Sequence, residues 1–180
     1  YIINWRLTRI GAVSDGMPGI TVPYEAFPGS IGVLPGEPEI KKWKAREAEL
    51  ASAGGVALTP SPGGALPAEV CGENGSDTDD CLRTIPPREN GGNMDVQQQQ
   101  IGTKIIFPCF IDGCGLFAGD IHYAQGDGEV SGTAIEMGSV ITLRVKILPG
   151  KGTDMDMPVT IGNDQIIDME PTRYYQTLGI

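Results

Sequence analysis

The chain has 180 residues, 40% hydrophobic and 20% charged, which is enough for one domain with a hydrophobic core. Its 26 glycines and 14 prolines exclude a protein of long helices, because both residues break helices. The formal net charge of −10 disfavours nucleic acid and anionic membranes as partners, and the single histidine excludes a site that needs two imidazoles from one chain.

The first third of the sequence predicts short strands followed by one helix. Trp5–Ile10 alternates with the period of two that is typical of a strand. Residues 38–53 are predicted to form a surface helix, because Pro38 suits a first helical turn and apolar residues, Trp43 among them, recur at helical intervals. Acids and bases are nearly balanced on its other face, which favours a solvated surface over a nucleic-acid site.

The rest of the chain predicts a long loop and then a strand-rich region. Residues 54–92 are rich in turn residues and read as loop, a length that favours a functional or subunit-contact role. Strands are predicted at Gly102–Phe110, Leu116–Tyr123 and Ser139–Leu148, and a hairpin at Val159–Met169. The pattern indicates a single, mainly β domain over residues 1–180, a sandwich or barrel with one surface helix and long loops.

The four cysteines do not have zinc-knuckle spacing. Cys109 and Cys114 lie in apolar surroundings, where we expect buried free thiols. Cys71 and Cys81 flank a polar loop and could form a disulfide. The reduced form is favoured, since nothing else marks a secreted chain.

The segment Gly119–Glu129, with sequence GDIHYAQGDGE, concentrates polar chemistry. On a strand, Asp120 and His122 point to the same side, and Glu129 follows a glycine-rich turn that can return its carboxylate to them. Such a set suits Zn²⁺ with an open position, or a metal-free site in which the glutamate is the base. From spacing alone, a plain hairpin turn with a surface histidine is the favoured alternative.

The segment Pro86–Asp95, PPRENGGNMD, forms a second polar cluster. Its paired glycines, Gly91 and Gly92, allow close backbone approach to a ligand. Backbone N–H groups there, with the amide of Asn93, could form an oxyanion hole. A loop that simply enters a strand is the favoured alternative on this pattern alone.

These two segments resemble the acetamidase/formamidase family. Phe27–Val33, Trp43–Glu47, the strand Ile105-Ile-Phe-Pro and Ala134–Glu136 match as well, in the same order. Arg88-Glu89-Asn90 before the paired glycines is more similar to the formamidase branch. Members often have histidine where this chain has Phe27, and their chains are about twice as long, so this sequence resembles a central fragment.

The resemblance implies a cytoplasmic, homo-oligomeric enzyme with a jelly-roll-like β-sandwich, in which this chain is paired with the remainder of a longer one. The implied reaction is hydrolysis of a short aliphatic amide, formamide in first place, to ammonia and the carboxylate. A divalent metal, zinc or alternatively calcium, is implied as cofactor. Cys109 and Cys114 are not expected to be nucleophiles.

The expected site residues have four roles. The metal ligands are Asp120, His122 and Glu129, and Glu129 or Glu136 moves protons to the leaving ammonia. Asn93 orients the amide and Asp95 supports the site from outside the ligand set. The substrate-binding candidates are Asn93, Gly92, Gln125 and Asp127. Two alternatives stay open: a binding or structural β-sandwich without activity, and a hydrolase of cyclic amides.

Overall fold

The computed structural model describes residues 2–55, 66–152 and 155–162. Their strands form three antiparallel sheets, so the predicted mainly β class is confirmed. An N-terminal sheet joins β1 (Arg6–Leu7), β2 (Ala12–Val13) and β3 (Thr21–Val22). A small sheet pairs β6 (Lys104–Ile106) with β9 (Val159–Ile161). None of the described helices is both long and apolar enough to cross a membrane.

The central sheet has four strands in the order β5-β4-β7-β8. They are β4 (Phe27–Gly32), β5 (Gly91–Asn93), β7 (Phe117–Ala124) and β8 (Ile135–Glu136). Strand β4 lies in the middle and pairs with β5 on one side and β7 on the other. The sheet therefore brings together three parts of the sequence that are far apart.

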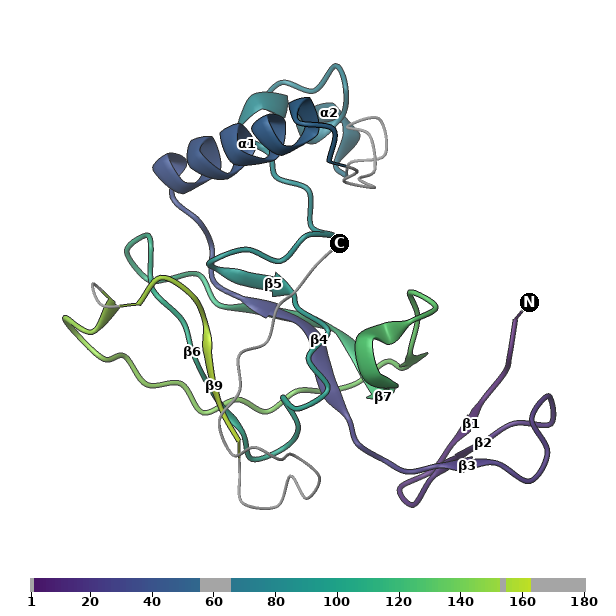
Figure 1. The fold of residues 1–180 in the computed structure, drawn as a ribbon. Coiled ribbons are helices and arrows are strands. Elements are labelled where there is room, and N and C mark those ends of the chain that lie inside the picture. Colours follow the sequence, from purple (N-terminus) through teal and green to yellow (C-terminus); the bar gives the residue numbers. More distant parts are fainter. Residues whose placement is uncertain (1, 56–65, 153–154, 163–180) are drawn as a thin grey trace.

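Helix α1 (Glu37–Ser52) lies over one end of this sheet and confirms the predicted helix (Figure 1). Pro38 stands in its first turn, where the missing N–H removes no helical hydrogen bond. The negative charges of Glu37 and Glu39 in the same turn stabilise the helix, because they lie at the positive end of its dipole. Trp43 is fully buried and packs edge-to-face on Phe110, with ring centroids 5.8 Å apart.

Ion pairs tie α1 to the segment that leads into β5. Arg46 binds both oxygens of Glu89, at 2.8 and 3.0 Å, and Lys42 lies 3.4 Å from the same carboxylate. The next residue of the helix, Glu47, binds Arg83 and Arg88. Burial alone would raise the pKa of Glu89, but the hydrogen bonds and charge of Arg46 prevail and lower it to about 2.

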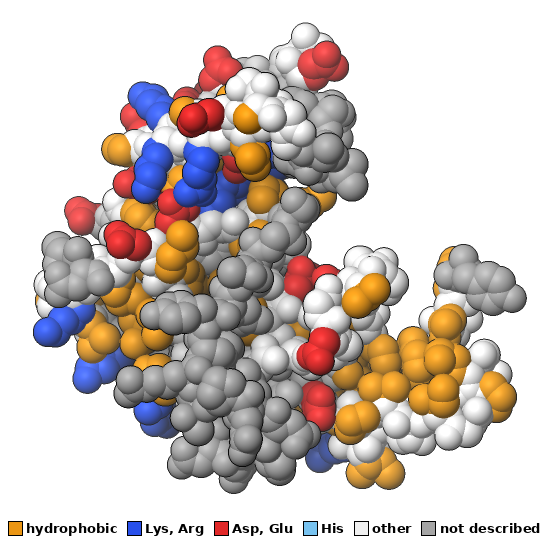
Figure 2. All heavy atoms as spheres, viewed as in Figure 1, with side chains coloured by type: hydrophobic (Ala, Val, Ile, Leu, Met, Phe, Trp, Pro, Cys, Tyr) orange, Lys and Arg blue, Asp and Glu red, His pale blue; other side chains and the backbone are white. Residues whose placement is uncertain are grey.

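The N-terminal sheet projects from the body of the molecule, and hydrophobic side chains gather over it (Figures 1 and 2). Its base is anchored: Ala12 is fully buried in a cluster with Tyr123, Ala124 and Ile135. The hydroxyl of Tyr123 also donates to the carbonyl of Thr8 at 2.6 Å. Strand β7 is thus fixed at its C-terminal end by this sheet, next to the histidine it carries.

Two short helical elements lie inside the predicted loop 54–92, α2 (Ala68–Cys71) and η2 (Thr78–Asp80). The predicted strand at Ser139–Leu148 is wrong: within the described residues this segment has no ladder partner, and its side chains are mostly exposed. Alternation gives a segment two faces but supplies no neighbouring strand. The turn and second strand of the predicted hairpin at Val159–Met169 lie outside the described residues, beyond β9.

The prediction of free thiols at Cys109 and Cys114 is also wrong. The two residues form a disulfide, because the turns between them bring their Cα atoms within 4.8 Å, and Cys109 is exposed rather than buried. Cys71 and Cys81 are paired as well, with Cα atoms 5.6 Å apart, so the reduced form that the sequence favoured is wrong. Helix α2 and the turn at η2 fold back on each other and close this second loop.

Candidate metal and amide site

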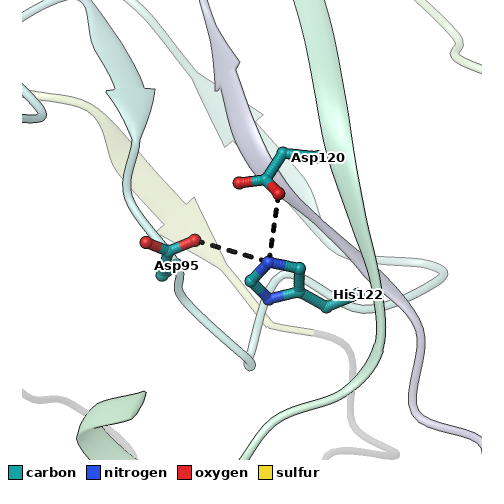
Figure 3. A group of neighbouring side chains, drawn as sticks. All are labelled: Asp95, Asp120 and His122. Carbon is teal, nitrogen blue, oxygen red and sulfur yellow. Dashed lines mark ion pairs between the residues drawn. The ribbon is translucent and has the colours of Figure 1, made fainter. Parts of the chain in front are cut away.

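The site is built around His122 on β7. In the sheet register, His122 stands opposite Phe27 of β4 and Glu136 of β8, so three strands meet at its ring. The ring is 1% exposed and is packed edge-to-face by Phe27, with centroids 5.1 Å apart. Asp120, two residues earlier on β7, places Oδ1 3.3 Å from Nε2 of the histidine (Figure 3). The two side chains therefore face the same side, as their spacing predicts.

Hydrogen bonds fix the tautomer of the neutral histidine ring, that is, which of its two nitrogens carries the hydrogen. The Nε2 amide of Gln125 donates to the backbone carbonyl of Asp95 at 2.7 Å, which turns its oxygen toward His122. That oxygen lies 2.8 Å from Nδ1. An amide oxygen only accepts, so Nδ1 carries the hydrogen and the lone pair of the neutral ring is on Nε2.

This lone pair faces carboxylates. Besides Asp120, the Nε2 atom has Glu136 at 3.7 Å and Asp95 at 3.8 Å. Asp95 comes from the loop after β5, so Figure 3 shows side chains from distant parts of the sequence that point toward one another. The Oδ1 atom of Asp95 is buried and has no hydrogen-bond partner among the described residues. A lone pair and several carboxylates that converge on one point fit a bound cation.

The pKa values reflect this crowding of acids. Burial and the neighbouring charges of Glu129 and Asp120 raise the pKa of Asp95 to about 6, against the opposing effect of His122. Burial, with Asp120 and Glu129, likewise raises the pKa of Glu136. Among the described residues, no lysine or arginine forms an ion pair with either carboxylate, whereas Arg46 and Lys42 lie beside Glu89. A divalent cation would favour the ionised form of both groups.

Backbone strain coincides with the site. Asp95, Asp120 and Glu129 have φ values of 49°, 55° and 44°, in the left-handed region that residues with a side chain rarely adopt. Among the described residues, only one other non-glycine residue, Cys114, shares this feature. Such strain costs about 1–3 kcal/mol per residue and is typically kept at functional sites.

Strand β4 supports the carboxylates through two of its residues, Gly29 and Ser30. At Gly29, an added Cβ would lie 2.7 Å from Oδ1 of Asp95 and 2.8 Å from both O and Oδ2 of Asp120, so only glycine fits between the two acids. The Ser30 hydroxyl lies 3.2 Å from Oδ2 of Asp120 and 3.0 Å from Oδ1 of Asn93. The Pro-Gly-Ser run in a strand was the available signal, since glycine there often marks close approach.

The expected ligands do not form one group. Two sets have possible ligand atoms within 4.8 Å of one another: Asp95 with Asp120 and His122, and His122 with Glu129 and Glu136. His122 is common to both, so the expected set of Asp120, His122 and Glu129 draws on each. One imidazole with carboxylates suits zinc, and a carboxylate-rich set also admits calcium.

The expected substrate-binding residues lie on β5, at the end of β7 and in the turn that follows it. Asn93 on β5 donates to the carbonyl of Ile85 at 3.1 Å and faces Ser30 with its oxygen. Gly92 has a φ of 106°, and Gln125 is the residue that orients His122. Asp127 lies in the 3₁₀ turn η3 (Asp127–Glu129) and accepts a hydrogen bond from Gln97.

Comparisons with known proteins give concordant matches. A family model described as "Acetamidase/Formamidase family" matches residues 1–180. An acetamidase from Mycolicibacterium smegmatis is 36% identical over 162 residues, covering 83% of this chain and 39% of the relative. A formamidase from Methylophilus methylotrophus is 29% identical over 151 residues, and the match covers 80% of this chain and 37% of the relative.

A solved structure agrees with these relatives. A gamma lactamase from Delftia acidovorans superposes with a TM-score of 0.68 at 28% identity, and the match covers 89% of this chain and 41% of that one. The chain spans about two fifths of the length of the curated relatives it matches.

Proposed function

The chain belongs to the acetamidase/formamidase family, and we propose that its protein hydrolyses a short aliphatic amide, formamide in first place, with the help of a divalent metal. The observation that carries the proposal is the lone pair on Nε2 of His122, which faces the oxygens of Asp120, Glu136 and Asp95 at 3.3–3.8 Å. Relatives named acetamidase and formamidase support an amide as the substrate.

Asp120, His122 and Glu129 are the proposed metal ligands. The buried, unpaired Oδ1 of Asp95 supports a cation at the same place, with Asp95 in contact with the ligand set. A divalent ion, zinc in first place and calcium as the alternative, would polarise the amide carbonyl or lower the pKa of a bound water. Gln125 contributes by holding Nδ1 protonated, which keeps Nε2 free to bind.

In the proposed reaction, water adds its oxygen to the amide carbon, the C–N bond breaks, and the nitrogen takes up a proton to leave as ammonia. Glu129 and Glu136 are the proposed carriers of that proton. Glu136 suits this role because its pKa is raised, chiefly by burial, and its side chain is still 53% exposed. A glutamate whose pKa is raised is a stronger base than an ordinary carboxylate, so it takes a proton from water more readily and can pass it to nitrogen.

Asn93, Gly92, Gln125 and Asp127 are the proposed substrate-binding residues. The amide nitrogens of Asn93 and Gln125 each have one hydrogen bonded within the protein, to Ile85 and Asp95. Each keeps a second hydrogen that can donate to a carbonyl oxygen. The site therefore has neutral donors beside a group of acids, which suits a small polar substrate.

A cyclic amide is the second candidate substrate. The Delftia acidovorans neighbour is named a gamma lactamase, and this chain superposes on it over 89% of its length. Assaying ammonia release from formamide and acetamide beside the ring opening of a γ-lactam separates the two candidates.

The test of the proposed function is the substitution His122→Ala, with Asp112→Asn as a control for an exposed acid outside the cluster. We expect His122→Ala to lose bound metal and to reduce ammonia release from formamide at least 100-fold, while the control retains both. Unchanged activity together with unchanged metal content would overturn the metal assignment. Absence of ammonia release by the wild-type protein from any amide would favour the non-catalytic binding scaffold.

We propose, further, that the protein is a homo-oligomer in the cytoplasm, in which this chain pairs with the remainder of a longer one. The exposed apolar side chains over β1–β3 support an interface on that sheet. The location rests on the family resemblance. Cytoplasmic thiols are normally reduced, so the two disulfides of the structure argue against this location. Alkylation of protein freshly released from cells tests it: modification of all four cysteines would support the cytoplasm, and protection of both pairs would contradict it.

A further inference from the structure

The β7–β8 connection, residues 126–133, carries Glu129 but has little packing of its own. All of its residues are exposed except Glu129, which is partly buried. An added Cβ at Gly126, Gly128 or Gly132 would meet no atom within 4 Å. Neither hydrophobic cluster of the described residues includes a member of this connection. Apolar burial therefore does not hold Glu129 in place.

Charge opposes the position of Glu129 as well. Its carboxylate has an oxygen within 4.8 Å of ligand atoms of His122 and Glu136. It also interacts with Asp95, in the loop after β5. Carboxylates at such distances repel one another wherever both are ionised. Without a bound cation, the acids of the site therefore favour displacement of the β7–β8 connection.

One amide side chain attaches this connection to the loop after β5. Gln97 in that loop donates from Nε2 to Oδ1 of Asp127, which lies two residues before Glu129 in the turn η3. Among the described residues, no lysine, arginine or other amide side chain binds a carboxylate of the connection. The hydrogen bond from Gln97 therefore opposes the displacement that the charges favour.

A second glutamine joins the same two segments. Gln125, directly after β7, donates to the backbone carbonyl of Asp95 at 2.7 Å. Gln97 follows Asp95 by two residues, and Asp127 follows Gln125 by two. The two hydrogen bonds thus connect the loop after β5 to the start of the β7–β8 connection at two points, with a donor on each side. One bond would allow rotation about itself, whereas two bonds fix the direction of the connection.

We propose that Gln97 is a positioning residue, which holds Asp127 and thereby keeps the carboxylate of Glu129 at the candidate metal and amide site. The inference rests on the proposed function for the role of Glu129 as metal ligand and proton carrier. A neutral amide suits this task, because it donates to a carboxylate without the positive charge by which a lysine would repel a bound cation. Gln97 acts through Asp127 and is not itself a ligand.

The first test measures zinc affinity in the full chain with Gln97→Met, which keeps the length of the side chain and removes the donor. Gln100→Met is the matched control, since Gln100 belongs to the same run of glutamines and its side chain forms no hydrogen bond among the described residues. We expect Gln97→Met to weaken zinc binding at least tenfold, because lost support of a ligand typically costs about 10–100-fold. Gln100→Met should bind zinc as the wild type does. Wild-type zinc affinity in a folded Gln97→Met would overturn the proposal.

The double variant Gln97→Glu/Asp127→Asn separates positioning from a general effect on folding. It reverses the hydrogen bond, so that an amide at position 127 donates to a carboxylate at position 97, and it keeps the net charge. We expect its zinc affinity to lie within about threefold of the wild type. Affinity as weak as that of Gln97→Met would contradict the proposal. Zinc binding is measured rather than ammonia release, because Asp127 is also a proposed substrate-binding residue.

Amide hydrogen exchange in metal-free protein covers the case in which no amide is hydrolysed and no zinc binds, so the two proposals fail separately. The N–H of Glu129 donates to the carbonyl of Gly126 at 3.1 Å, and the N–H of Gly132 donates to the carbonyl of Glu129 at 2.7 Å. We expect both to exchange at least tenfold faster in Gln97→Met than in the wild type or Gln100→Met, and at the wild-type rate in the double variant. Equal exchange in all four proteins would overturn the proposal. Should Gln97→Met fail to fold, the double variant decides, since faster exchange there would contradict the positioning role and wild-type exchange would support it.

Discussion

The two ends of β5 carry carboxylates in opposite electrostatic settings. Before the strand, Glu89 is buried against Arg46 and Lys42, and its pKa is lowered to about 2. After the strand, Asp95 is grouped with other acids and one histidine, and its pKa is raised to about 6. Glu89, whose role is to hold α1 in place, is thus neutralised by an arginine of the protein itself. Among the described residues, the acids around His122 lack such a partner, which is expected of a site that an external cation completes.

The largest expected effect separates the two carboxylates by pH, in metal-free protein. The pKa of Asp95 is raised from 3.8 to about 6, so its stabilising contribution is complete below pH 3.8 and is lost as the pH rises through 6. Glu89, lowered from 4.5 to about 2, contributes above pH 4.5 and loses its contribution as the pH falls through 2.

The measurement is urea unfolding with a chelator present. The free energy of unfolding of the wild type should fall as the pH rises from 4 to 7, and Asp95 should account for up to ~3 kcal/mol of that fall, because its pKa is shifted by about two units. Asp95→Asn should remove this part of the fall. Glu89→Gln serves as the control and should keep that fall. An identical pH dependence in wild type and Asp95→Asn would show that Asp95 is not perturbed.

Gly29→Ala tests the close approach of β4 to the acidic site. The added methyl group would displace Asp95 and Asp120, from which it would lie 2.7–2.8 Å. Misplaced ligands and their neighbours typically cost 10–100-fold in metal affinity, so we expect a loss of about 100-fold, or ~2.7 kcal/mol, in a zinc titration. Gly16→Ala, which meets only ordinary contacts, should bind metal as the wild type does. Equal affinity in both variants would argue against ligands at this place.

Arg46→Met tests the ion pairs of Glu89, the carboxylate that precedes β5. It leaves Glu89 buried with Lys42 as its remaining partner, so we expect a loss of about 2 kcal/mol in the free energy of unfolding. The loss is smaller than for fully buried pairs because Arg46 is half exposed. Lys41→Met on the exposed face of α1 provides the comparison and should change stability little. An Arg46→Met protein with the same free energy of unfolding as the wild type would mean that the ion pairs do not secure α1.

Ser30→Ala has the smallest expected effect. The Ser30 hydroxyl has one proton and two acceptors, Asn93 and Asp120, so it orients the acid without binding the metal itself. Loss of one such hydrogen bond costs about 1 kcal/mol, and we expect zinc affinity to fall about fivefold. Ser30→Thr should restore most of it, whereas Ser52→Ala on α1 should have no effect. A loss as large as that of Gly29→Ala would instead indicate a ligand role for Ser30.

Local patterns in the sequence predicted the parts of the site that lie close together in the chain. Strand spacing placed Asp120 and His122 on one side of β7, and the helical pattern located α1 within one residue at each end. The approach of Asp95 could not be predicted in this way, because it depends on β4 lying between β5 and β7. Sequence reasoning placed Asp95 outside the ligand set, whereas the structure brings its Oδ1 to the histidine.

The errors have a common physical cause. Alternation at Ser139–Leu148 predicts a strand only where a partner strand exists, and the described part of the chain supplies none. The roles of Gly29 and Ser30 depend equally on neighbours distant in sequence, since each contacts residues more than sixty positions away. Patterns of one segment carry no information about which segment will lie beside it.

The most direct test of the account is the metal content of the protein purified without a chelator, measured by native mass spectrometry together with ammonia release from formamide. The account predicts about one divalent ion per chain, loss of the ion and of activity after chelation, and recovery of both when zinc or calcium is restored. Full ammonia release by ion-free protein would contradict it.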